Sequence, residues 1–174
     1  MISFARRLSV IGVAAIGTVA LVWPAIYLPV ARIIYNASDS APRGWYRASP
    51  PESLHVGSYV LARLPTEVTA LAAERHYLPV GIPLLKRIGA MAPQTVCVND
   101  RVVSIDGVPS ATALTMDWVG RRLPVWPQCR SLHDDELFLL STTNQASFDS
   151  RYFGPVSTSA VIGTAQPLWT WSTP

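Results

Sequence analysis

The chain has 174 residues and a formal net charge of +3, and only 14% of its residues are charged. Its arginines are scattered without any basic run, which argues against a nucleic-acid partner. Fifteen prolines and ten glycines spread along the chain favour short elements joined by turns, and therefore a mainly β domain.

The N-terminal segment is strongly apolar. No charged residue occurs between Leu8 and Ala31, and a helix of that length spans a bilayer core of roughly 30 Å. Arginines flank the run on both sides, so their count does not decide its orientation. We expect residues 1–34 to form a single N-terminal transmembrane helix that is retained as an anchor. The alternative is a cleaved secretory signal, but its apolar region would span only about 7–15 residues.

The rest of the chain, residues 35–174, is expected to form one domain of about 140 residues, which is enough for a core of its own. Residues 35–50 are small and polar and are expected to be a loop. Thr66–His76 is predicted to be the one short helix, with Thr66 as its N-cap. Strands or hairpins are expected at 57–64, 84–88, 94–105 with a turn at Asn99-Asp100, 136–142, 156–164 and 167–171.

Cys97 and Cys129 are the two cysteines of the chain, and both belong to the predicted domain. An isolated pair in an exported domain favours a disulfide, which would close a loop and stabilise the fold by roughly 3–4 kcal/mol. The alternative is a pair of buried free thiols in a cytosolic domain.

Common catalytic motifs are missing from the sequence. It contains no G-x-S-x-G, H-E-x-x-H, C-x-x-C or P-loop pattern, and none of its three histidines has a telling context. His133 stands beside three acidic residues, but a solvated turn explains that cluster better than a metal site. No metal or other cofactor is expected.

One compositional feature concerns Lys86, which is the single lysine beside thirteen arginines. It lies in an apolar context, P-L-L-K-R-I-G. Burial can deprotonate a lysine, whereas arginine stays charged. A role that needs a neutral amine would explain the lysine, and so would a coding bias towards arginine.

Three segments, in order, resemble the type I signal peptidase family, whose members use a serine-lysine dyad. S-D-S-A-P at 38–42 follows the apolar segment, L-K-R-I-G occupies 85–89, and S-F-D-S-R-Y-F-G occupies 147–154. The resemblance implies a signal-peptidase-like β domain that acts as a serine endopeptidase. It implies Ser40 as the nucleophile and Lys86 as the general base.

The resemblance also implies supporting roles. The Ser40 backbone N–H and the Ser38 hydroxyl would stabilise the oxyanion, and Ser147 would orient the lysine amine. Asp149 and Arg151 would form a structural pair. A carboxylate beside Lys86 would raise the lysine pKa and oppose its use as a base, so Asp149 is not expected to be catalytic.

The similarity is closest to the TraF-type peptidases of conjugative plasmids. Ala41 replaces the methionine that usually follows the nucleophile in housekeeping signal peptidases, and T-T-N-Q at 142–145 replaces their G-D-N-R motif. This branch implies a bacterial inner-membrane protein whose catalytic domain faces the periplasm. Its expected partners are a membrane-bound, propilin-like precursor, the lipid bilayer, and components of the type IV secretion (conjugation) apparatus.

The precursor would be released by hydrolysis, or joined to its own amino end as a ring if that amine intercepts the acyl-enzyme. The first alternative is a non-catalytic, membrane-anchored assembly or binding protein of the transfer apparatus. The second is an envelope-binding β domain in which the three segments coincide by chance.

Overall fold

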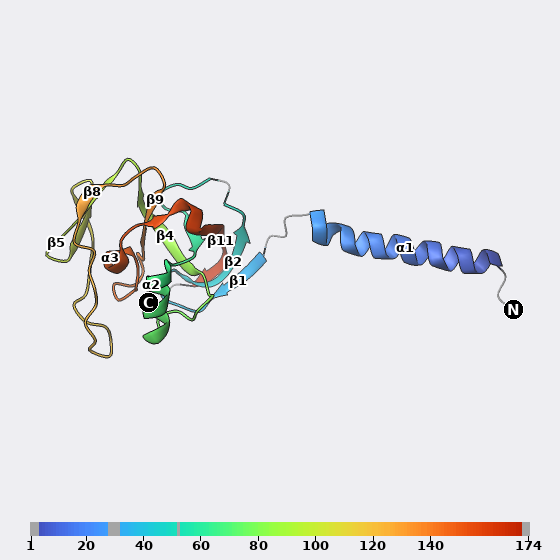
Figure 1. Cartoon of the computed structure of the whole chain (residues 1–174), viewed down its shortest axis with the longest axis horizontal. Helices are drawn as coiled ribbons and strands as arrows, with labels where there is room; N and C mark the ends of the chain where they lie inside the picture. Colours follow the sequence, from blue (N-terminus) through green and yellow to red (C-terminus); the bar gives the residue numbers. More distant parts are fainter. Residues whose placement is uncertain (1–3, 28–31, 52, 172–174) are drawn as a thin grey trace. The chain divides into compact units, whose positions relative to one another are not determined.

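The computed structural model shown in Figure 1 describes residues 4–27, 32–51 and 53–171. The chain divides into two compact units, Met1–Ala31 and Arg32–Pro174. The first contains helix α1 (Phe4–Tyr27), whose side chains are described for residues 9–23. Over the described part of the chain, no helix has both the length and the apolarity required to cross a membrane. The N-terminal anchor therefore stays a prediction, and residues 1–3 and 28–31 of it lie outside the described residues.

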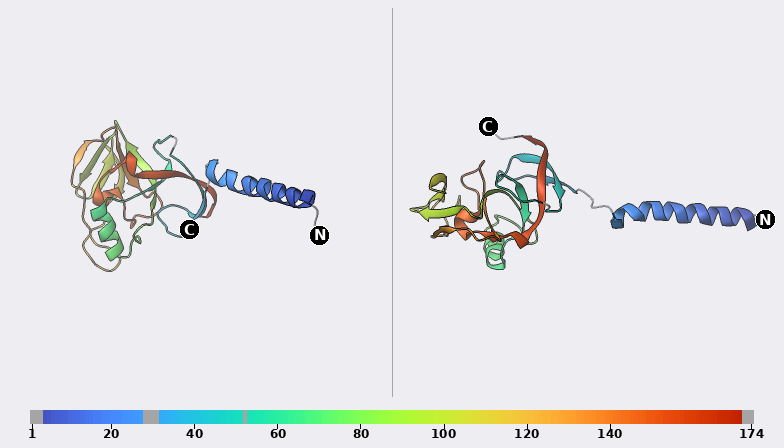
Figure 2. Two further views of the ribbon diagram at one scale, coloured as in Figure 1. Left: turned by 45° about the vertical axis from the view of Figure 1, so that its right-hand side comes forward. Right: turned by 90° about the horizontal axis from the view of Figure 1, so that it is seen from above.

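The second unit is built on an antiparallel sheet. Among the described residues this sheet has seven strands, in the order β1-β2-β11-β3-β4-β9-β10. The strands are β1 (Arg32–Asn36), β2 (Arg43–Ser49), β3 (Tyr59–Ala62), β4 (Leu84–Met91), β9 (Glu136–Leu140), β10 (Val156–Ser157) and β11 (Val161–Trp171). The long strand β11 pairs with both β2 and β3 and so joins the N-terminal hairpin to the middle of the sheet (Figure 2). The prediction of a mainly β domain is confirmed.

A second sheet is smaller, and in Figure 1 it lies at the side of the domain where β5 and β8 are labelled. In the described residues it has the order β7-β6-β5-β8, with β5 (Thr95–Asn99), β6 (Val102–Ile105), β7 (Val108–Thr112) and β8 (Cys129–Ser131). Cys97 and Cys129 are direct partners across β5 and β8 and form the predicted disulfide. The β5–β6 turn is centred on Asp100 and Arg101, one residue later than predicted, because both adopt positive φ as such two-residue hairpins require.

The helices of this unit differ in part from the prediction. Helix α2 spans Thr66–Glu74; Pro65, not Thr66, is its N-cap, and the positive φ of His76 (59°) lies just past its C-cap Arg75. A one-turn helix, α3 (Ser150–Phe153), and a 3-10 turn, η1 (Thr158–Ala160), were not predicted. Segments of three or four residues are too short to show a helical period in the sequence.

The expectation of a loop over residues 35–50 is wrong for most of its length. β1 and β2 pair as a hairpin from Arg32↔Ala48 to Asn36↔Gly44, so the loop is limited to residues 37–42. Gly44 allows this arrangement because its φ is 142° and a Cβ there would collide with the carbonyl oxygen of Trp169 on β11. The hairpin sets the short loop, with Ser40 in it, at a defined place beside the sheet.

Candidate active site

The loop that carries Ser40 connects β1 and β2 and is organised by one buried side chain, that of Asn36. The Asn36 amide donates to the carbonyl oxygens of Ser38, Ala41 and Pro42 at 3.0, 3.0 and 3.2 Å. Its Oδ1 accepts the Ser38 backbone N–H at 3.1 Å. Asn36 therefore replaces the backbone partners that a six-residue loop lacks, and it fixes the path of the chain through Ser40.

Further contacts hold the same loop from outside. The hydroxyl of the buried Tyr46 donates to the Pro42 carbonyl at 2.6 Å, and burial raises the pKa of Tyr46 to about 12. Thr143 Oγ1 donates to the Asp39 carbonyl at 2.7 Å. Asp39 also forms an exposed ion pair with Arg43, with Oδ1 2.6 Å from Nε. Ser40 itself stays half-buried, so its hydroxyl is accessible from the cleft described below.

Lys86 lies in the interior of the domain, on β4. The strand alternates strictly between buried and less buried positions, and Leu84, Lys86 and Ile88 share the buried side. Lys86 is 0% exposed, and the adjacent Val60 of β3 is its register partner. Burial lowers the pKa of Lys86 to about 8; the charge of Asp149 raises it and that of Arg151 lowers it further. The direction expected for a buried lysine is therefore found.

Ser147 brings the two segments together. The Lys86 amine donates to Ser147 Oγ, and the Ser40 and Ser147 hydroxyl oxygens lie 3.1 Å apart, within hydrogen-bond distance. Ser147 itself is 4% exposed. Ser40, Lys86 and Ser147 are remote in the sequence but meet at one hydroxyl group. Ser147, expected to orient the lysine amine, thus links Ser40, the expected nucleophile, to Lys86, the expected base.

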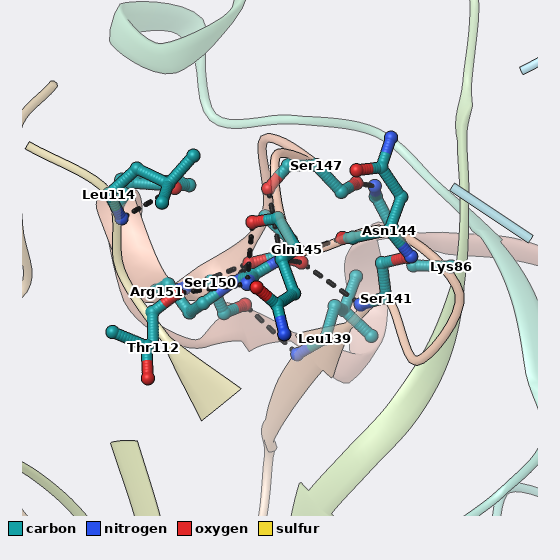
Figure 3. Close-up of polar contacts among 12 residues, drawn as sticks. Lys86, Thr112, Leu114, Leu139, Ser141, Asn144, Gln145, Ser147, Ser150 and Arg151 are labelled. Atoms are coloured by element: carbon teal, nitrogen blue, oxygen red, sulfur yellow. Dashed lines mark hydrogen bonds and ion pairs between the residues drawn. The ribbon is translucent and has the colours of Figure 1, made fainter. Parts of the chain in front are cut away.

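The position of Ser147 is fixed by Arg151, which Figure 3 shows among Asn144, Gln145 and Ser147, and by the buried ion pair that Arg151 forms with Asp149. Arg151 Nε lies 2.7 Å from Asp149 Oδ1, Nη2 lies 2.8 Å from Oδ2, and both residues are at most 1% exposed. The Arg151 guanidinium also donates to the carbonyl oxygens of Gln145 and Ser147, at 2.9 and 3.1 Å, and Asp149 Oδ2 accepts the Ser141 N–H at 2.9 Å. The pair therefore holds both ends of the loop that leads from β9 to α3.

Ser38 lies close to Ser40, but its hydroxyl has another partner. Ser38 Oγ donates to Asn36 Oδ1 at 2.8 Å. It would have to rotate away from Asn36 before it could donate to an oxyanion. Sequence reasoning missed Asn36 itself, because it falls in the segment of small polar residues that was expected to be a loop. The polar residue at the very end of β1, immediately before the loop, is the signal that could have pointed to it.

A largely apolar cleft of about 640 Å³ opens beside these residues. Its lining includes Ser40 and Ser147 together with apolar and aromatic side chains, among them Ile34, Leu61, Leu84, Tyr77, Leu114, Trp118, Leu123, Phe148 and Tyr152. A mostly apolar cleft that also holds polar groups is the usual form of a binding site for an apolar segment.

The match to known proteins covers nearly the whole chain. The family described as "Signal peptidase, peptidase S26" matches residues 5–171, which include all three segments noted in the sequence. A "Plasmid transfer protein TraF" of Escherichia coli is 33% identical over 173 residues, covering 92% of this chain and 94% of the relative. A "Probable conjugal transfer protein TraF" of Sinorhizobium fredii is 32% identical over 175 residues, covering 95% and 88%. The chain therefore belongs to the signal peptidase family, peptidase S26.

Proposed function

We propose that this protein is a membrane-anchored serine endopeptidase that cuts a pilin precursor or another protein of a conjugative-transfer system. The observation that carries the proposal is the meeting of Ser40 and the buried Lys86 at the Ser147 hydroxyl, beside a mostly apolar cleft that Ser40 and Ser147 line. Membership of the peptidase family supports the reaction type, and the printed names of the relatives support a conjugation-related role.

In this proposal Ser40 Oγ attacks the scissile carbonyl carbon, and its proton passes to the neutral Lys86 amine. The Ser40 N–H and a rotated Ser38 hydroxyl donate to the oxyanion, as proposed donors. Collapse breaks the C–N bond, and the Lys86 ammonium returns the proton to the leaving amine. Water or the amino end of the precursor then attacks the ester carbonyl of the acyl-enzyme and frees Ser40. Attack by water would give a linear product, and attack by the amine a cyclic one.

The protonation of Lys86 sets the expected pH dependence. With a pKa of about 8, most Lys86 side chains carry a proton at pH 7 in the free protein. Cleavage measured as kcat/KM should therefore rise as the pH increases through about 8, since only the neutral amine can accept a proton. A precursor that fills the cleft would exclude water and lower the lysine pKa further.

The location in the cell is part of the same proposal. We place the apolar N-terminal segment in the bacterial inner membrane and the β domain in the periplasm. The 24 uncharged residues from Leu8 to Ala31 support an anchor, and the Cys97–Cys129 disulfide supports an oxidising compartment. An anchor would bring Ser40 and the cleavage site of a membrane-bound precursor to the same surface, which raises their effective concentration.

Cleavage of a propilin-like membrane precursor by the full-length protein tests the proposal. We expect Ser40→Ala and Lys86→Met to abolish cleavage, while the control variants Ser110→Ala and Arg87→Met, at exposed positions, cut at the wild-type rate. Mass spectrometry of the product separates hydrolysis from cyclisation. If wild type binds the precursor without cutting it, the protein is the non-catalytic assembly component considered above. If Ser40→Ala cuts normally, Ser40 is not the nucleophile and the Ser-Lys assignment is wrong.

A further inference from the structure

A second feature of the cleft is a tight turn that presents an exposed tryptophan. Trp118 lines the cleft and is 86% exposed, and the next residue, Val119, is 54% exposed. The turn lies between Met116 and Arg122, which pair as an isolated antiparallel bridge. The Leu123 N–H also donates to the Thr115 carbonyl at 2.9 Å. A large apolar side chain is thus held out towards solvent at the rim of the proposed catalytic cleft.

The turn is rigidly built, and Asp117 is its centre. Asp117 Oδ1 accepts the backbone N–H groups of Val119 and Arg121 at 3.0 and 2.9 Å, and Oδ2 accepts Arg121 Nε at 2.7 Å. The Gly120 N–H donates to the Asp117 carbonyl at 3.0 Å, and Gly120 adopts a φ of 85°. Burial alone would raise the pKa of the Asp117 carboxyl. The hydrogen bonds that it accepts outweigh burial and lower this pKa well below the usual range. The turn keeps its shape at any pH near neutrality.

The turn is also tied to the end of α2, on another wall of the cleft. The Tyr77 hydroxyl donates to Asp117 Oδ2 at 2.5 Å. Arg75 donates to the Arg122 carbonyl at 2.9 Å, and Arg121 donates to the Arg75 carbonyl at 3.1 Å. These contacts join segments about 45 residues apart and set the direction in which the turn projects. Trp118 thus projects from a turn that is held by the hydrogen bonds of Asp117, Tyr77 and Arg121.

We propose that Trp118 is a substrate-binding residue that selects an apolar side chain of the precursor at a fixed distance from the scissile bond. The inference rests on the proposed peptidase function and adds a specificity element to it. Tyr77, Leu123 and Phe148 line the cleft together with Trp118, and the same cleft continues to Ser40. We take the polypeptide substrate as the occupant, because Ser40 and Trp118 line the same cleft.

Physical reasons favour this role over an incidental exposed residue. A tryptophan offers a large contact area, and aromatic residues of this kind dominate binding energies at protein interfaces. Since the turn is already ordered, the substrate does not have to immobilise it, and less of the binding free energy is lost as entropy. We expect the contact to change affinity by about tenfold.

Binding of labelled peptides to the full-length Ser40→Ala protein tests this inference without depending on catalysis. The peptides consist of small residues, with one leucine placed at successive positions from the centre of the peptide outward. Fluorescence anisotropy should show that leucine at one remote position tightens binding about tenfold. The additional change Trp118→Ala should abolish that gain, so that the leucine and leucine-free peptides bind this variant with the same affinity.

Two further variants act as controls. Trp169→Ala removes another exposed tryptophan, which lies on β11 and not among the cleft residues, and it should keep the full leucine effect. Asp117→Ala releases the turn and should weaken the leucine effect without loss of folding, as judged by circular dichroism. The inference is overturned if no leucine position tightens binding or if the gain survives Trp118→Ala. The peptidase proposal fails separately, through the cleavage assay with Ser40 and Lys86 variants.

Discussion

The two sides of the active site are built in opposite ways. Lys86, Asp149 and Arg151 are at most 1% exposed; Lys86 donates to the Ser147 hydroxyl, and Arg151, paired with Asp149, donates to the Ser147 carbonyl. The loop that carries Ser40 is partly exposed, and the ion pair at its surface, Asp39–Arg43, has side chains that are 42% and 38% exposed. One side is interior and electrostatically constrained, and the other is a surface loop held chiefly by a single asparagine.

This difference follows from the chemistry that we propose for each side. A lysine acts as a base only where a low-dielectric environment disfavours its ammonium form, so it must be buried. A nucleophilic hydroxyl must reach a substrate carbonyl, so it cannot be buried in the same way. The four predictions below test this contrast, from the largest expected effect to the smallest.

The strongest test removes the carboxylate of the buried pair. Asp149→Ala leaves the Arg151 guanidinium buried without its counter-charge, and we expect the free energy of unfolding to fall by about 3–5 kcal/mol. Urea denaturation measures this loss. The exposed Asp134→Ala serves as the control and should change stability by less than about 0.5 kcal/mol. A loss from Asp149→Ala as small as that of the control would show that the pair is not structural.

A second test uses the pH dependence of stability. The Lys86 pKa is about 8 in the folded state and 10.5 as its ordinary value. Between these two pKa values the unfolded chain binds more protons than the folded protein, so the free energy of unfolding should rise with pH. Below pH 8 the folded state holds a buried, charged lysine, which costs about 3 kcal/mol of stability. Lys86→Met should remove this rise, and Arg87→Met should keep it, in urea titrations from pH 7 to about 10.5. Parallel curves for Lys86→Met and wild type would contradict the lowered pKa.

The third test concerns the loop side. Asn36→Ala removes the donor for three loop carbonyls, and we expect a loss of about 1–3 kcal/mol in stability. Because the loop positions Ser40, kcat should fall with little change in KM. Asn99→Ala, at an exposed position on β5, is the matched control. Unchanged kcat in Asn36→Ala would show that the loop keeps its shape without this side chain.

The smallest effect is expected at the exposed ion pair. Asp39→Ala should cost about 0–1 kcal/mol, since solvent and salt screen exposed pairs. Urea denaturation at low and high salt measures the loss, which should shrink as the salt concentration rises. A loss of unfolding free energy as large as that of Asp149→Ala would mean that the ion pair of the loop is as important for stability as the buried pair, which contradicts the contrast.

The sequence predicted the fold class from compositional signals, whereas the candidate site residues came from the resemblance to the signal peptidase family. Scattered turn residues indicated the β domain, and a single lysine in an apolar segment pointed to Lys86. The disulfide was predicted because Cys97 and Cys129 had no other partner. The β1–β2 hairpin was missed because its small polar residues resemble a loop, and its pairing with β11 comes from the other end of the chain.

The sequence by itself thus determined that the single lysine lies in a short apolar segment, since this follows from residue type alone. The alternating burial along β4, which places the Lys86 side chain in the interior, came from the structure. The tertiary structure alone decided that Lys86 and Ser40 share the Ser147 hydroxyl, and that Asn36 holds the loop. It also decided that Trp118 faces the same cleft as Ser40. The physical reason is that these contacts join residues far apart in the chain, and only the packing of the strands and connecting loops brings them within reach of one another.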